Sequence, residues 1–116
     1  ELLTLTRFDK KLLLESQGLG TAIRPISADF QYRYGTTPYS GDVENFQIGT
    51  DGETFLTTRN FNPARTSNYI FGSDAEFTYT VWEEDEPIYL GYDTSTPLTN
   101  GDGVLDVWFT YKILDL

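Results

Sequence analysis

Residues 105–113 read L-D-V-W-F-T-Y-K-I, and this stretch decides the fold that the sequence predicts. An apolar side chain stands at every second position, and the positions between hold polar residues and Trp108. A period of two is typical of a β-strand that buries one face, whereas an amphipathic helix repeats its apolar residues every three or four positions. We therefore predict a half-buried strand here, with Trp108 on its polar face.

Similar short runs of β-forming residues recur throughout the chain. Residues 77–81 and 30–34 show the same alternation over shorter lengths. Further candidate strands are residues 2–6, 10–15, 43–48, 53–58, 68–71 and 87–92. Turn-forming residues separate these runs, and no segment has convincing helical periodicity. We predict an all-β fold, an antiparallel, jelly-roll-like β-sandwich of about eight strands with an extended N-terminal arm.

The chain has 116 residues, which is the size of one domain with a single core. Its first twenty residues differ from the rest, because clustered leucines flank basic residues and are followed by Gly18 and Gly20. We predict an N-terminal arm or edge strand over residues 1–20 and a β-sandwich domain over residues 21–116. As an arm, the segment crosses to a neighbouring subunit; as an edge strand, it begins the sandwich.

The composition excludes several classes of chemistry. The chain contains neither cysteine nor histidine, which removes disulfides, thiolate metal sites and the histidine general base. Its formal net charge of −10 would repel a nucleic-acid backbone, and no apolar run approaches the roughly 18 residues of a membrane span. We expect no enzyme, no cofactor, no nucleic-acid partner and no membrane partner. A halophilic host would also explain the excess of acids.

One segment resembles part of a calcium-binding loop. Residues 100–106 read N-G-D-G-V-L-D, which fits the middle of an EF-hand loop when Gly103 takes the place of its invariant glycine. In that alignment Leu98 and Phe109 occupy the first and last ligand positions, and neither side chain can bind a cation. We predict a hairpin turn and no metal site, with weak calcium binding as the alternative.

Aromatic residues make up 16% of the chain, which is more than one small core normally takes. Trp82 and Trp108 both fall on the polar faces of predicted strands, where a tryptophan packs under a loop, anchors a protein interface or stacks on a sugar ring. A basic loop with an aromatic ring lies near residue 60. The predicted partner contacts come from these features and from the N-terminal leucines: Trp108, Trp82, Arg59, Phe61, Arg65, Leu12, Leu13 and Leu14.

Two segments together carry a resemblance to a known class of proteins. Residues 48–50 (I-G-T) and 55–56 (F-L) form a strand-turn-strand pattern, and residues 99–111 (T-N-G-D-G-V-L-D-V-W-F-T-Y) form a final strand. In this layout the chain resembles the small jelly-roll-type structural proteins of tailed bacteriophage virions, including capsid decoration (cement) proteins. The motifs are apolar patterns with turn residues, and they contain no chemistry of their own.

The resemblance implies a non-enzymatic protein on the capsid surface of a virion. Proteins of this class bind the major capsid protein and stabilise its shell, often as homotrimers, so the same partners are implied here. Two other functions fit a rigid sandwich with exposed aromatic residues. One is a carbohydrate-binding β-sandwich module, and the other is a subunit of a surface or appendage assembly joined by donated strands.

Overall fold

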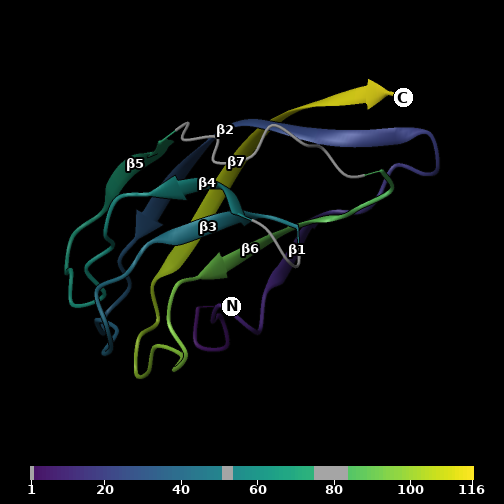
Figure 1. Cartoon of the computed structure of the whole chain (residues 1–116). Coiled ribbons are helices and arrows are strands. Elements are labelled where there is room, and N and C mark those ends of the chain that lie inside the picture. Colours follow the sequence, from purple (N-terminus) through teal and green to yellow (C-terminus); the bar gives the residue numbers. More distant parts are fainter. Residues whose placement is uncertain (1, 51–53, 75–83) are drawn as a thin grey trace.

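Figure 1 shows the fold in a computed structural model of the whole chain, which describes residues 2–50, 54–74 and 84–116. These residues contain no helix, and so none that is long and apolar enough to cross a membrane. Their strands, in chain order, are β1 (Lys11–Leu14), β2 (Thr21–Arg33), β3 (Phe46–Gly49), β4 (Thr54–Thr58), β5 (Tyr69–Asp74), β6 (Ile88–Tyr92) and β7 (Val104–Asp115). The predicted all-β fold is confirmed, with seven strands among the described residues.

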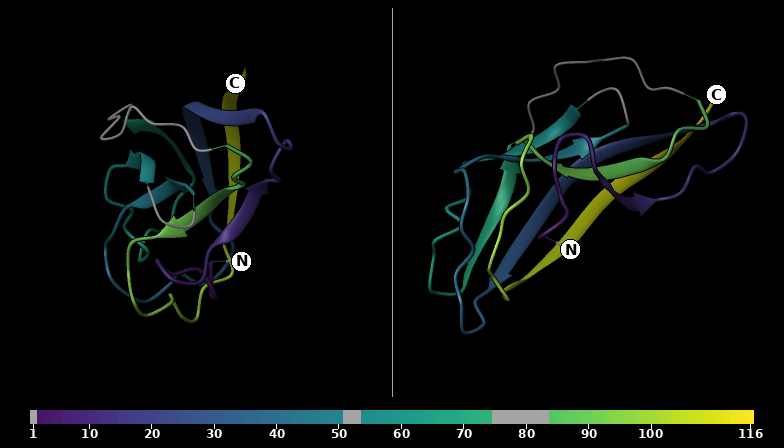
Figure 2. Two further views of the ribbon diagram at one scale, coloured as in Figure 1. Left: turned by 45° about the vertical axis from the view of Figure 1, so that its right-hand side comes forward. Right: turned by 90° about the horizontal axis from the view of Figure 1, so that it is seen from below.

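The strands form two layers joined at one corner. One layer has the order β1-β6-β3-β4 and the other the order β5-β2-β7, and every neighbouring pair is antiparallel. The corner strand is β5, because its residues 69–72 pair with β2 while Ser73 and Asp74 pair with β4. Figure 2 shows the layers from two further sides. The predicted antiparallel β-sandwich is confirmed, and β1 and β7 stand at the two ends of the strand order.

The long strands β2 and β7 form the spine of the molecule. They pair over nearly their whole length, and the molecule measures 47 Å in its longest direction against 24 and 21 Å in the others. The predicted strand over residues 105–113 lies within β7 and is confirmed. A bulge between Pro25 and Ser27 interrupts β2. Since β5 pairs with β2 only at residues 29–32, Pro25, which has no N–H to donate, does not lie between β5 and β7.

Two local predictions are wrong, and a third cannot be compared with the described residues. The predicted strand over residues 2–6 is wrong, because residues 2–4 form turns and the Thr6 hydroxyl closes a further turn. The predicted hairpin at residues 100–103 is also wrong, because β6 and β7 on either side of that loop belong to different layers. Turn-forming residues mark where a strand ends, but they do not fix which strand it pairs with. The predicted strand over residues 77–81 lies outside the described residues.

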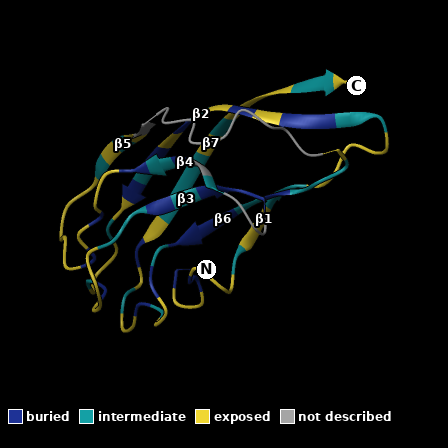
Figure 3. Cartoon of the chain, in the orientation of Figure 1, coloured by how far each residue is buried: buried dark blue, intermediate teal, exposed yellow. Residues whose placement is uncertain are grey.

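A cluster of aromatic rings forms the core between the layers. The ring of Phe46 lies 5.7 Å from that of Phe30, 5.3 Å from that of Phe61 and 4.9 Å from that of Tyr92, measured between centroids. Phe71 stacks on Phe30 at 5.1 Å. Figure 3 shows the buried residues in dark blue along β2, β3 and β6. Ring contacts of this kind add about 0.5–1.5 kcal/mol each beyond area burial, so much of the high aromatic content serves the core.

The N-terminal residues lie against the sandwich. Leu2 and Leu5 are buried and belong to the core cluster, while Leu13 and Leu14 are half-buried and pack against it. Residues of β1 pair with β6 in antiparallel register. In the structure Lys11–Leu14 is an edge strand, and Leu2, Leu5, Leu13 and Leu14 pack with the body of their own chain.

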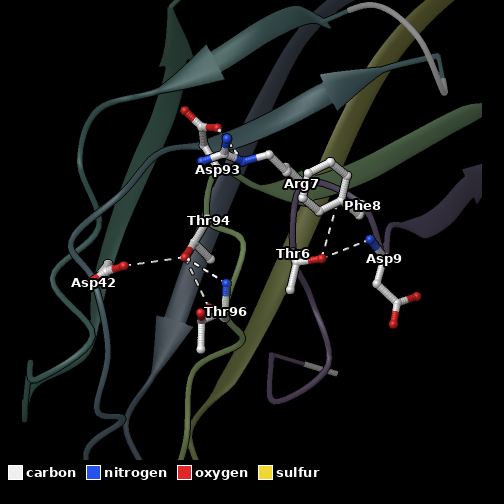
Figure 4. Close-up of polar contacts among 8 residues, drawn as sticks. All are labelled: Thr6, Arg7, Phe8, Asp9, Asp42, Asp93, Thr94 and Thr96. Carbon is white, nitrogen blue, oxygen red and sulfur yellow. Dashed lines mark hydrogen bonds and ion pairs between the residues drawn. The ribbon is translucent and has the colours of Figure 1, made fainter.

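Polar contacts fasten the segment before β1 to the loop after β6 (Figure 4). The Thr6 hydroxyl accepts hydrogen bonds of 3.1 and 2.9 Å from the backbone N–H groups two and three residues further along. The backbone N–H of Arg7 donates to the carbonyl of Thr94 at 2.9 Å, and its guanidinium lies 3.6 Å from the Asp93 carboxylate. These contacts hold the N-terminal segment against the loop that follows β6.

Candidate functional site

Trp108 lies in the middle of β7, on the side of the β5-β2-β7 layer that faces away from the core; we call this side the outer face. Its side chain is 55% exposed, whereas its neighbours Val107 and Phe109 pack against the core. Asp29 of β2 and Gly72 of β5 continue the same row across the sheet. Because Gly72 has no side chain, one flank of this row is flat. In the structure Trp108 therefore points away from the core, as predicted.

The rest of the outer face mixes apolar and charged side chains. Ile70 is 71% exposed and Val104 is 46% exposed. Between them Arg33 and Asp106 form a two-pronged ion pair, with Nε 2.7 Å from Oδ2 and Nη2 3.3 Å from Oδ1. An exposed pair of this kind stabilises a protein by at most about 1 kcal/mol, but it orients both side chains on the sheet. The outer face thus offers apolar contacts framed by ordered charges.

The basic loop between β4 and β5 differs from its predicted form. The Phe61 ring is fully buried beside Phe46, so the prediction that Phe61 is an exposed partner contact is wrong. Its backbone N–H also donates to the carbonyl of Glu44 at 2.8 Å, which holds the residue in the body. Arg65 lies with its guanidinium 3.7 Å from the centroid of the Tyr69 ring, a cation–π contact. Arg59 and Arg65 remain exposed.

The other predicted contact residues lie on the first layer or outside the described residues. Leu12 is exposed on β1, whereas Leu13 and Leu14 are half-buried against the core of their own chain. Trp82 lies outside the described residues. Since β1 and β7 stand at opposite ends of the strand order, the structure does not bring these leucines onto the outer face with Trp108.

A groove opens between the free edges of the two layers, with a cavity volume of about 650 Å³. One wall consists of Leu13 on β1 and Leu90 on β6, and the other consists of Leu105 and Val107 on β7. Leucines from residues 2–5 also line the groove. In the described part of the chain β1 pairs only with β6, and β7 pairs only with β2, so a strand edge borders the groove on each side.

Asp102 fastens two loops together beside this groove. Its carboxylate accepts hydrogen bonds from the Thr36 hydroxyl at 2.6 Å, from the Thr36 N–H at 2.9 Å and from the Thr37 N–H at 2.9 Å. These bonds, the Thr36 hydroxyl first among them, hold the pKa of Asp102 below its ordinary value. Residues 2–50, 54–74 and 84–116 contain no group of three or more acidic side chains arranged to hold a metal ion.

The glycines of the same loop are needed for close packing. A Cβ atom on Gly101 would collide with the Tyr39 ring, and one on Gly103 would collide with the Tyr32 ring and hydroxyl. The Tyr39 hydroxyl donates to the carbonyl of Gly103 at 2.5 Å. The Tyr32 hydroxyl is buried without a hydrogen-bond partner among the described residues, and burial raises its pKa. The G-D-G sequence therefore serves tyrosine packing rather than a hairpin turn.

Sequence reasoning missed both the groove and the role of Asp102. The groove joins residues from the two ends of the chain, and no local pattern indicates which strands remain unpaired. One signal was present. The alternating run over residues 105–113 is longer than any other predicted run, so its apolar face needs more cover than the short strands supply.

No family model matches the chain, and no curated protein or solved structure is significantly similar to it. Two surfaces among the described residues offer contacts to another molecule. They are the outer face around Trp108 and the groove between β1 and β7.

Proposed function

We propose that this chain is a non-enzymatic structural protein of a virion, a capsid decoration protein that binds the major capsid protein and stabilises its shell. The resemblance of residues 48–56 and 99–111 suggests this class, and the antiparallel sandwich is a suitable scaffold for it. The contact surface in this proposal is the outer face, with Trp108 at its centre. The residues that bind are therefore side chains on a sheet, with no reaction assigned to them.

The exposure of Trp108 on a paired strand is the observation that carries the proposal. Tryptophan is among the residues that contribute most to protein interfaces, because it buries a large area and loses little conformational entropy. The twelve residues of β7 pair with β2 along almost their whole length, so the ring stands on a rigid support. The Arg33–Asp106 pair beside it supplies a polar rim of the kind that surrounds an interface core.

Association on a repeating shell fits a surface of this modest size. A homotrimer that binds several shell subunits at once gains from effective concentration, so each contact can be weak while the complex remains bound. The net charge of −10 favours solubility of the faces that remain in water. The trimer and the shell partner are both part of the proposal.

The test is co-sedimentation of the protein with purified capsid shells at rising protein concentrations. Trp108→Ala should weaken retention by about 30-fold or more, the effect of losing an interface anchor worth about 2 kcal/mol. The same change should lower the Tm by less than about 3 °C, because the side chain is exposed. Phe8→Ala is the matched control, since Phe8 is 76% exposed and lies in the segment before β1, beside the loop after β6. Equal retention of Trp108→Ala and the native protein would refute the assignment.

One observation favours a carbohydrate-binding module as the second candidate. The exposed ring of Trp108 shares its row with the carboxylate of Asp29 and the bare backbone of Gly72, which leaves a flat strip with a hydrogen-bond acceptor beside an aromatic platform. Sugar rings stack on aromatic side chains and need such acceptors for their hydroxyl groups. Binding on a glycan array that Trp108→Ala and Asp29→Ala both abolish would select this function over the shell protein.

A further inference from the structure

The groove between β1 and β7 borders the outer face along β7 and shares Val104 and Asp106 with it, but its floor is formed by Leu105 and Val107, which face the core. It has the properties of a binding site for one additional strand. We propose that it accepts an extended segment of another protein chain, which pairs with the free edge of β7 and lays alternate apolar side chains on the groove floor. This inference does not depend on the proposed function, because Trp108 points away from the groove.

The burial of neighbouring residues shows that cover is missing beside β7. On β2 the inward-facing Ala28, Phe30 and Tyr32 are 2%, 0% and 0% exposed. Their direct partners on β7 are Phe109, Val107 and Leu105, and all three face the same core but are only half-buried. The inward face of the sheet is therefore fully covered at β2 but only partly covered at β7, the next strand. Covering apolar surface of this kind with another apolar surface is favourable, because it removes both from water.

The other wall of the groove shows the same change. On β6 the inward-facing Ile88 and Leu90 are buried, whereas Leu13 on the neighbouring β1, which lines the groove, is half-buried. Both layers thus lose cover toward the same opening. An additional strand placed between β1 and β7 would bury the apolar side chains of both.

The strand edge indicates that the occupant is a peptide. Along an edge strand, alternate backbone N–H and C=O groups point away from the paired neighbour and need partners. For β7 that neighbour is β2, and the groove lies on the other side, next to Leu105 and Val107. A lipid or a small apolar ligand would cover the leucines but leave these backbone groups unpaired. An extended peptide supplies both kinds of contact, as in other cases of strand addition.

Charge favours a different chain over a second copy of this one. The chain has a net charge of −10, and the charged residues that line the groove are Asp102, Lys11 and Asp106, the last of which is paired with Arg33. Two such acidic chains repel each other, whereas a neutral or basic segment is attracted. The occupant that fits is therefore an extended segment with apolar residues at alternate positions and basic or neutral residues between them.

The experiment uses the full chain and a nine-residue probe, acetyl-Lys-Val-Thr-Val-Lys-Val-Thr-Val-Lys-amide. Hydrogen exchange measured by NMR should show that the probe slows exchange of backbone amides in β7 near Leu105 and Val107. A scrambled peptide of the same composition, with its valines adjacent, should bind with an affinity at least about tenfold lower, because its apolar side chains no longer share one face.

Methylation of the probe's backbone nitrogens tests the pairing without changing the protein. The amides of the valines point to one edge of the strand and those of the lysines and threonines point to the other. A peptide that pairs with β7 should lose binding when one set is methylated and keep more of it when the other set is methylated. Equal binding of the scrambled peptide, or no slowing of exchange in β7, would overturn the proposal.

Two protein variants complete the test. Leu105→Lys places a charge on the groove floor and should weaken binding of the probe by about tenfold or more. Leu19→Ser, at a residue that is 82% exposed and does not line the groove, should leave the affinity unchanged. A free chain that already dimerises with protected β7 amides would show that a second copy is the occupant and overturn the assignment to another protein. A second result would also overturn the assignment to a peptide. It is displacement of the probe by the apolar dye 1-anilinonaphthalene-8-sulfonate while the backbone amides of β7 stay unprotected from exchange.

Discussion

The corner where β5 joins the two layers and the groove between β1 and β7 are built from similar apolar residues, yet they differ in cover. At the corner, Phe30, Phe46 and Phe61 are fully buried, because β5 pairs with both layers. At the groove, Leu13 and Leu105 are half-buried, because no described strand joins β1 to β7. The comparison teaches that the same kinds of apolar residue are fully covered on one side of this small sandwich and leave apolar surface open on the other.

The largest expected effect is at the corner. Phe46→Ala removes a ring that contacts Phe30, Phe61 and Tyr92, and the cavity it leaves should lower the free energy of unfolding by about 3–5 kcal/mol. Urea unfolding followed by circular dichroism measures the loss. The exposed Phe8→Ala serves as a control and should change stability by less than about 0.5 kcal/mol. Equal losses for both variants would break the comparison.

A matched pair of leucines sharpens the comparison directly. Leu56 on β4 is 1% exposed, so Leu56→Ala should lower the free energy of unfolding by about 2–5 kcal/mol. Leu105 on β7 loses the same atoms from a half-buried site, so Leu105→Ala should cost about 1 kcal/mol. Urea unfolding of the two variants gives the two losses in the free energy of unfolding, which can then be compared. A larger loss for Leu105→Ala would mean that the groove side carries the stability.

A pair of glycines tests the close packing at the end of the groove. Gly103→Ala forces a Cβ atom onto Tyr32 and should cost about 1–3 kcal/mol through overpacking. Gly72→Ala, on the outer face, brings its Cβ no closer than 3.6 Å to the Asp29 carboxylate, an ordinary contact. Its unfolding temperature should stay within a few degrees of that of the native protein. A stable Gly103→Ala would show that the loop is free to move away from the tyrosine.

The smallest expected effect is on the acid sensitivity of the loops that Asp102 fastens. Because hydrogen bonds lower the pKa of Asp102 in the folded protein, they stabilise the fold above the ordinary carboxyl pKa of about 3.9. This stability is lost as the pH falls through the lower, folded pKa. Asp102→Asn should therefore be less stable than the native protein at neutral pH and lose less on acidification. Urea unfolding at neutral and acid pH gives the change in the free energy of unfolding with pH for each protein. Equal changes in the native protein and in Asp102→Asn would contradict the role given to Asp102.

Much of the architecture could be predicted because alternation is a local signal. Residues 105–113 predict their strand and most of its inward face, because Leu105, Val107, Phe109 and Ile113 pack against the core. Trp108 points outward as the pattern requires, whereas Tyr111, which the pattern places inward, is 42% exposed. The first half of β2 was missed for a physical reason. Before the bulge Ile23 and Pro25 are buried at odd positions, and Ala22, which forms an isolated bridge with Glu84, is buried as well. After the bulge Ala28 and Phe30 are buried at even positions. The extra residue thus shifts the alternation, and the first part of β2 lacks the regular period of two that indicates a strand.

The candidate site could be predicted only in part. The outward tryptophan follows from periodicity, but the burial of Phe61 does not, because polar and turn-forming neighbours give it the sequence of an exposed loop. Its burial depends on distant rings such as Phe46 and Tyr92. The groove depends on the absence of pairing between strands from opposite ends of the chain, and such an absence leaves no local pattern in a sequence.

The unequal lengths of the two edge strands have a mechanical consequence. β1 has four residues with a register shift in its ladder, whereas β7 has twelve that pair along nearly the whole of β2. Because fewer backbone pairs hold β1 than hold β7, we expect β1 to separate from its neighbour at a lower force than β7 does. The short strand beside the opening is therefore the part of the sandwich that we expect to yield first.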